Sequence, residues 1–175
     1  MLKIYIIPGI LFGLLVLESI ATGLLPAPLL QLEVQYIPHW VLIFSILVLL
    51  FFDSPLSYHG IINGMIFALI IDLVYTDLLG VYFLAYAVTL YIIHLLKKLL
   101  HQNFYVAMLS VTLGLVIAEC LIFGAYLLIG HINLDFNTYV ESRLIPTVLI
   151  NLLFFLIVYP LSVKWLSSWQ KEKES

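Results

Sequence analysis

The stretch FALIIDLVYTDLLG, residues 67–80, is apolar enough to lie in a lipid bilayer, yet it carries Asp72 within it and Asp77 just beyond it. An aspartate at the centre of a bilayer helix costs roughly 2.5–3.5 kcal/mol on insertion scales, so such a residue normally faces protein or water. We therefore expect Asp72 to have a specific role inside a helical bundle, and Asp77 to lie in a turn outside the membrane.

The composition of the whole chain agrees with a membrane environment. Of the 175 residues, 64% are hydrophobic and 10% are charged, whereas about a quarter of the residues in soluble domains are charged. A helix that crosses a membrane needs about 20 mainly apolar residues, so the chain has room for about six crossings joined by short loops. We expect a single all-α polytopic membrane domain over residues 1–175.

The breaks between the apolar runs predict where the helices end. Pro26 and Pro28 end the first run, and the Asp-Ser-Pro turn at 53–55 ends the second. A polar connection at 130–143 precedes the last run, and the charged tail at 169–175 is expected to fray. The predicted helices are 4–25, 37–52, 58–75, 79–96, 104–129 and 144–166.

The positions of the basic residues predict the topology, because Lys and Arg accumulate on the cytoplasmic side of membrane proteins. In a six-helix arrangement only Arg143 falls on the outer side, and a five-helix arrangement would break this pattern. The first run follows Lys3 as in a signal peptide, but it is longer than usual and is interpreted as a retained helix. Both termini are predicted to be cytoplasmic. The residues on the cytoplasmic side are Lys3, Lys97, Lys98, Lys164, Lys171 and Lys173.

Four polar side chains in different predicted helices are expected at a similar depth. At about 1.5 Å per residue, Glu18, Asp72 and Glu119 lie roughly 21–22 Å from the cytoplasmic ends of their helices. Asn151 enters from the opposite side and lies roughly 10 Å below the outer boundary. Such a layer is typical of an outward-facing cavity or a partner-docking site, and equally of structural hydrogen bonds inside a bundle. The sequence leaves both open.

Two pairs of glycines have the spacing that lets helix backbones approach closely. GILFG places Gly9 and Gly13 on one helix face, and GIING does the same for Gly60 and Gly64. Packing within the chain is favoured over a dimer face, because the pattern is common in membrane helices.

The sequence predicts no metal, no cofactor, no catalytic residue and no nucleic-acid partner. The single Cys120 excludes a Cys-based metal site, and the few scattered basic residues exclude a phosphate-binding surface. No zinc-protease, nucleophile-elbow or P-loop motif occurs. The histidines lie in different segments without metal-site spacing, so they are interpreted as solvated or interfacial: His39, His59, His94, His101 and His131.

The order of these features resembles the MreD family of bacterial rod shape-determining membrane proteins. The resemblance rests on GIINGMIFALIIDLVYTDLLGVYFLAYAVTLYI, residues 60–93, and on RLIPTVLINLLFFLIVYPL, residues 143–161. The chain departs from the family at Thr76 and Asp77, where members often have a turn with Gly or Ser.

The resemblance implies a non-catalytic, multi-pass subunit of the cell-elongation complex in the bacterial inner membrane. Such a subunit binds MreC, a bitopic membrane protein, and acts indirectly on the elongation penicillin-binding protein and the SEDS glycosyltransferase that build peptidoglycan. In its six-helix architecture the family also looks like the S-components of energy-coupling-factor transporters.

That likeness supplies an alternative function, a vitamin-binding S-component. The acidic layer and the face of Gly9 and Gly13 are compatible with it, but an acidic layer suits a cation better than most vitamins, and the outer loops offer few groups to hold one. A small channel or proton-coupled carrier is a third alternative, but the sequence shows no inverted repeats of the kind found in many carriers.

Overall fold

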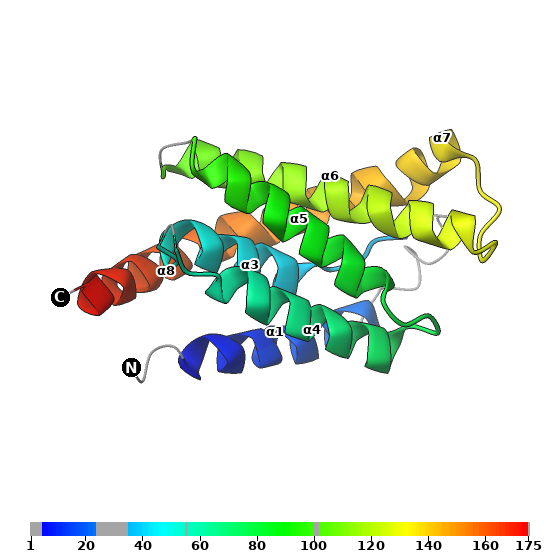
Figure 1. The fold of residues 1–175 in the computed structure, drawn as a ribbon. Coiled ribbons are helices and arrows are strands. Elements are labelled where there is room, and N and C mark those ends of the chain that lie inside the picture. The colour runs from blue at the N-terminus through cyan, green and yellow to red at the C-terminus, as the bar shows by residue number, and fades with distance from the viewer. Residues whose placement is uncertain (1–4, 24–34, 55, 100–101, 175) are drawn as a thin grey trace.

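The computed structural model describes residues 5–23, 35–54, 56–99 and 102–174. Within these segments the chain is helical and has no strand, as expected for an all-α protein (Figure 1). The predicted ends of the first helix, at 4 and 25, lie outside them. The elements are α1 (Ile6–Gly23), α3 (Trp40–Phe51), α4 (His59–Tyr75), α5 (Val81–Lys97), α6 (Phe104–Leu128), α7 (Phe136–Tyr139), the π-helical turn η2 (Val140–Leu144) and α8 (Ile145–Glu174).

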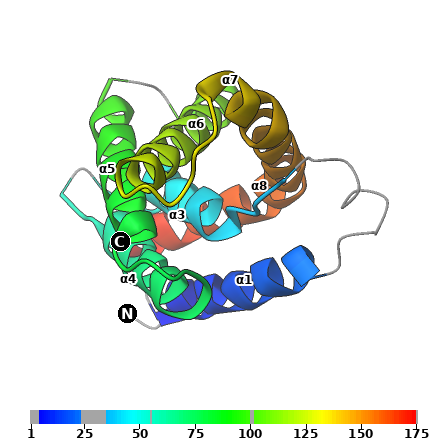
Figure 2. The same ribbon diagram turned by 90° about the vertical axis from the view of Figure 1, so that its right-hand side faces the viewer.

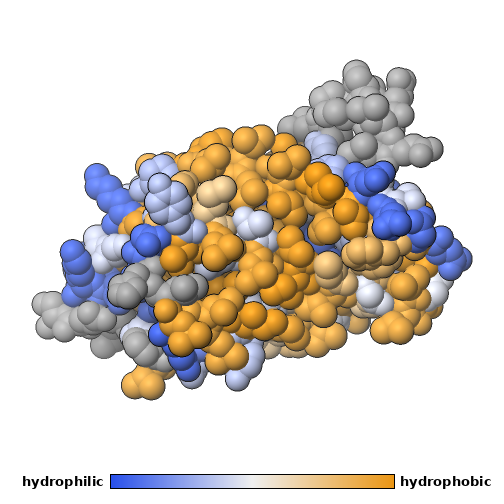
Figure 3. Space-filling view, turned by 90° about the horizontal axis from the view of Figure 1, so that it is seen from above, coloured by the Kyte–Doolittle hydropathy of each residue, from blue (hydrophilic) through white to orange (hydrophobic). Residues whose placement is uncertain are grey.

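The surface of the bundle agrees with a membrane environment. Apolar side chains cover the middle of the face in Figure 3, and hydrophilic side chains gather at its two ends. The helix α6 and the continuous helix Phe136–Glu172 are long and apolar enough to cross a membrane, whereas α1, α3, α4 and α5 are apolar but shorter.

Helix α3 is the centre of the bundle. Its sequence, WVLIFSILVLLF, has Ser45 as its one polar residue, and every residue from 41 to 51 is buried. A helix that is apolar on all sides must be covered on all sides. Helices α1, α4, α5, α6 and α8 all contact α3, and Figure 2 shows them arranged around it.

The two ends of the bundle differ in charge. Helix α1 begins, α5 ends and α8 ends at the same end, which we call the lysine end because it carries Lys97, Lys98 and Lys171 (Figure 1). The opposite end contains α7, the turn at 76–80 and Arg143, and we call it the α7 end (Figure 1).

At the lysine end, charged side chains close the ends of neighbouring helices. The carboxylate of Asp53 accepts hydrogen bonds from the backbone N–H groups of His59 at 3.0 Å and Gly60 at 2.7 Å, in the first turn of α4. The Nζ atom of Lys97 donates to the carbonyl oxygens of Leu49, at 2.6 Å, and of Asp53, at the end of α3. Each charge has the sign that the helix dipole favours.

Three predicted boundaries are wrong, for different reasons. Helix α3 begins at Trp40 instead of 37, because backbone groups of Ile37 and His39 bond to the side chain of Asn151 and form no helical turn. The connection at 130–143 is helical from residue 136 onward, and α8 continues to Glu174, beyond the predicted end at 166. Trp169 packs against the core, which favours the extra turns.

The two glycine pairs lie in different environments. A Cβ atom on Gly60 would lie 2.8 Å from the backbone N of Leu49 and 2.8 Å from the carbonyl oxygen of Ser45, so α4 approaches the backbone of α3 directly. A Cβ on Gly64 would lie 3.1 Å from Ser45 Oγ. Gly9 and Gly13 are exposed, and no described atom lies within 4 Å of a Cβ placed on either. Packing within the described chain therefore involves only the second pair.

Alanine substitutions at Gly60 and Gly13 are expected to change stability in opposite directions. Gly60→Ala should lower the free energy of unfolding by about 1–3 kcal/mol, because its methyl group meets backbone that cannot rotate away. Gly13→Ala should be neutral or stabilising by up to about 1 kcal/mol, since alanine favours a helix and the site is open. Thermal unfolding in detergent measures both. Equal effects at the two sites would contradict the close approach of α3 and α4.

Candidate functional site

A non-helical segment, residues 35–39, enters the α7 end of the bundle and leads into α3. Backbone inside a membrane bundle needs hydrogen-bond partners from the protein. Here α8 supplies them: Asn151 Nδ2 donates to the carbonyl oxygen of Ile37 at 2.7 Å, and Asn151 Oδ1 accepts from the N–H of His39 at 2.7 Å. Thr147 Oγ1 accepts from the N–H of Ile37 at 3.2 Å. The Asn151 side chain thus supplies hydrogen bonds that a helical turn would otherwise provide to this backbone.

A polar cluster surrounds the side chain of His39, which is 0% exposed. Its Nε2 atom lies 2.7 Å from Glu119 Oε1, and its Nδ1 atom lies 2.9 Å from the Tyr86 hydroxyl. Arg143 Nε donates to Glu119 Oε2 at 3.0 Å, and the Tyr139 hydroxyl donates to the same carboxylate. We define these five residues as the polar cluster.

The polar cluster joins the start of α3 to α5, α6, α7 and η2, which are distant in sequence. Both Glu119 and His39 are completely shielded, and the Arg143 side chain is 17% exposed. A buried carboxylate is tolerated when it is paired and its oxygens accept hydrogen bonds, and Glu119 meets both conditions. The arrangement is that of a clamp that fixes helix positions.

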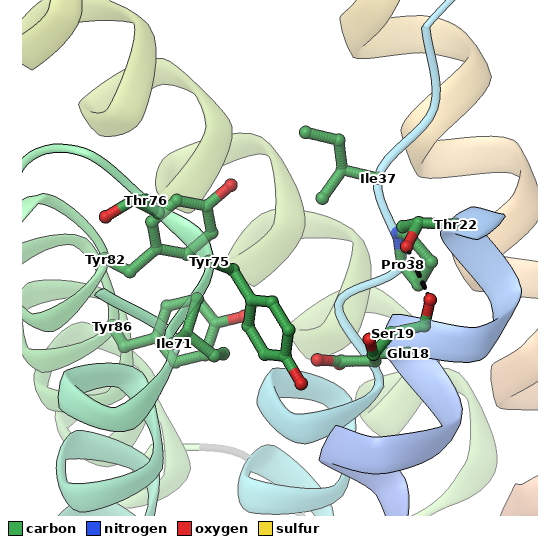
Figure 4. A pocket seen from close by; sticks show the side chains of 10 residues that line it. All are labelled: Glu18, Ser19, Thr22, Ile37, Pro38, Ile71, Tyr75, Thr76, Tyr82 and Tyr86. Atoms are coloured by element: carbon green, nitrogen blue, oxygen red, sulfur yellow. Dashed lines mark hydrogen bonds between the residues drawn. The ribbon is translucent and has the colours of Figure 1, made fainter. Parts of the chain in front are cut away.

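Cavities open beside the polar cluster, and two of them adjoin each other. One has a volume of about 290 Å³ and lies between α1, α4 and α5, with Glu18 in its wall. We call it the Glu18 cavity (Figure 4). The other has a volume of about 300 Å³ and reaches Arg143. Both are lined by Ile37, Tyr75, Thr76 and Tyr82, so they are neighbours. Within the described segments no three His, Cys, Asp or Glu side chains gather closely enough to hold a metal ion.

Of the four side chains predicted to share a layer, the structure brings Glu119 and Asn151 together through His39. Glu18 lies nearby, because its Oε1 atom accepts from the N–H of Val41 at 2.7 Å, in the first turn of α3. The other member of the predicted layer, Asp72, makes its contacts elsewhere.

Asp72 lies near the end of α4, and its buried carboxylate contacts the first turn of α5. Its Oδ1 atom accepts from the N–H of Tyr82 at 2.9 Å, and its Oδ2 atom accepts from the N–H groups of Gly80 at 3.0 Å and Phe83 at 2.9 Å. These N–H groups have no partner inside their own helix. A carboxylate placed there also complements the positive end of the helix dipole. Asp72 is thus an N-terminal cap supplied by the preceding helix.

Four residues of the polar cluster were not predicted as site residues from the sequence: His39, Tyr86, Tyr139 and Arg143. The interpretation of the histidines as solvated or interfacial is wrong for His39, and His94 is also buried. The available signal was the position of His39 immediately before the most apolar run of the chain, where a polar side chain needs a partner.

Comparison with known proteins shows what the chain is similar to. The family described as rod shape-determining protein MreD matches residues 3–169. Over 158 residues the chain is 33% identical to the rod shape-determining protein MreD of Bacillus subtilis (strain 168), and the match covers 90% of each chain. No solved structure matches the chain.

Proposed function

The chain belongs to the MreD family of rod shape-determining membrane proteins, and on that premise we propose that it is a non-catalytic subunit of the cell-elongation complex. In this role it binds an MreC-like bitopic membrane protein and helps to control peptidoglycan synthesis and cell shape. Contact with the elongation penicillin-binding protein and the SEDS glycosyltransferase is indirect, through that partner. The observation that carries the proposal is the family relationship over nearly the whole chain.

The geometry of the buried polar groups supports a non-catalytic role. Asp72 accepts three backbone hydrogen bonds, and Glu119 is held by His39, Tyr139 and Arg143. These carboxylates are occupied by the fold, whereas a general acid or base needs to reach a substrate proton. The family is one of shape-determining proteins and not an enzyme family.

The arrangement of charges supports one multi-pass domain over residues 1–175, with both termini in the cytoplasm of a bacterial cell. Lys97, Lys98 and Lys171 share an end of the bundle with the start of α1, and Arg143 lies at the other end (Figure 1). By the positive-inside rule the lysine end faces the cytoplasm of the inner membrane. The α7 end, with its cavities, then faces outward.

The alternative function as an S-component of a vitamin transporter is not favoured. Its expected fold resemblance finds no support among solved structures. The family relationship agrees with the shape-determining role instead.

Affinity purification of the tagged full-length chain from native membranes tests the proposed function. We expect an MreC-like bitopic protein to be recovered, because the family role requires an assembly. The penicillin-binding protein and SEDS glycosyltransferase should be recovered in lower yield, and should disappear when the MreC-like protein is depleted. Recovery of transporter ATPase subunits without the MreC-like protein would reject the proposal. An unrelated tagged membrane protein of similar abundance is the control.

A further inference from the structure

Glu18 differs from the other buried acidic residues of the bundle. It is 7% exposed, and it accepts hydrogen bonds only from backbone N–H groups at the start of α3, those of Trp40 and Val41, among the described residues. Among the described residues no Lys, Arg or His side chain pairs with it, whereas Glu119 has both His39 and Arg143. A carboxyl group inside a membrane bundle without a counter-ion is costly and marks a candidate binding site.

The carboxyl group of Glu18 lies at the wall of the Glu18 cavity. In Figure 4 it projects from α1, and across the space from it lie Tyr75 of α4 and Tyr82 and Tyr86 of α5. The Tyr86 ring is fixed in place by the contact of its hydroxyl with His39 Nδ1 at 2.9 Å. The cavity is therefore bounded by an acid on one side and by aromatic rings on the other.

This combination selects one class of ligand. An anion would be repelled by an ionised Glu18, and a purely apolar ligand would leave an ionised Glu18 without a counter-ion. A bare metal ion would lack further ligands, because no three suitable side chains gather among the described residues. Organic ammonium groups are attracted by both a carboxylate and the faces of aromatic rings.

We propose that the Glu18 cavity binds an organic ammonium group, with Glu18 as its counter-ion and the rings of Tyr75 and Tyr82 beside it. The volume of about 290 Å³ accommodates a small amine or the head group of an amine-bearing lipid. Both sources present the same cation to the same residues. The proposal does not depend on a role in cell elongation.

Choline and its neutral isostere, in which a tert-butyl group replaces trimethylammonium, test the charge requirement. Choline should bind the purified full-length chain in detergent and raise its thermal unfolding temperature in a saturable way, and the isostere should not. Glu18→Gln keeps an acceptor for the N–H of Val41 but removes the charge. It should weaken choline binding by about tenfold or more in calorimetric titration. Glu141→Gln, at an exposed acid of the same end, should bind choline as the unchanged chain does.

A second variant keeps the test decisive if Glu18→Gln folds poorly. Tyr75→Leu removes an aromatic ring from a residue that is 48% exposed, so the stability of the ligand-free protein should be nearly unchanged. The affinity for choline should fall several-fold. The proposal is overturned if choline fails to bind, if the isostere stabilises as well as choline, or if neither variant weakens choline binding.

Lipid nanodiscs distinguish the two sources of the ammonium group. Discs containing phosphatidylethanolamine should stabilise the unchanged chain more than discs of phosphatidylglycerol alone, and Glu18→Gln should abolish the difference, if a lipid head group is the ligand. Equal stability in both discs, with choline binding intact, supports a soluble amine. A lipid effect that persists in Glu18→Gln would place the lipid outside the cavity and count against a lipid ligand there.

Discussion

Replacing Glu119 by leucine is expected to lower the free energy of unfolding by about 3–5 kcal/mol, because breaking a buried ion pair leaves the opposite charge without a partner. Arg143 and His39 would both lose the carboxylate that they contact at 3.0 Å and 2.7 Å. Thermal and denaturant unfolding in detergent measures the effect. Folded yield in membranes should fall in parallel.

A double variant separates the lost pair from the uncompensated charge. The loss of unfolding free energy in the double variant Glu119→Leu/Arg143→Leu should be smaller than the sum of the losses in the two single variants. In the double variant both charges of the pair are absent, so neither is left buried without the other. Glu141→Leu, at an exposed acid in η2, is the matched control and should change stability by no more than about 0.5 kcal/mol. Additive single effects, or a Glu119→Leu variant as stable as this control, would contradict the clamp.

Substituting Asp72 by leucine is expected to lower the free energy of unfolding by about 3 kcal/mol. The N–H groups of Gly80, Tyr82 and Phe83 all lose their acceptor. Asp72→Asn should lie between leucine and the unchanged chain. Its carbonyl oxygen replaces one carboxylate oxygen, but its amide N–H₂ would face N–H donors. Unfolding in detergent ranks the two variants.

The same two variants distinguish a cap from a proton-relay or cation-binding role for Asp72. If Asp72 acts as a cap, the asparagine variant should preserve rod-shape rescue and partner recovery better than the leucine variant, at equal membrane abundance. If Asp72 acts by ionising, the asparagine variant should be as damaged as the leucine variant, since neither side chain can carry a charge. Equal failure of the two variants would therefore reject the capping role. Asp77→Asn, in the exposed turn after α4, is the control.

Much of the helical arrangement could be predicted because its signals are local. Long apolar runs separated by proline, aspartate and lysine clusters predicted helices close to α4, α5 and α6. The close approach at Gly60 agrees with the spacing of its glycine pair, but the same spacing at Gly9 and Gly13 has no such contact among the described residues. The end of α8 could not be predicted in this way, because the packing of Trp169 depends on helices elsewhere in the chain.

The site was only partly predictable because its contacts join residues far apart in sequence. Depth along the helices placed Glu119 and Asn151 at a similar level, but their shared partner, His39, lies 80 and 112 residues away from them. The capping role of Asp72 needs the turn at 76–80 to fold back, and no pattern in its own helix specifies that.

The buried position of α3 has a consequence for the synthesis of the protein. The non-helical segment before α3 receives hydrogen bonds from α8, which leaves the ribosome long after α3. Until then, backbone groups of residues 35–39 lie unpaired in or near the membrane, where lipid offers them no hydrogen bonds. A premature stop before Asn151 would leave that state permanent, and such products should be recognised and degraded by membrane proteases. Correct folding of the segment before α3 therefore waits for the synthesis of α8.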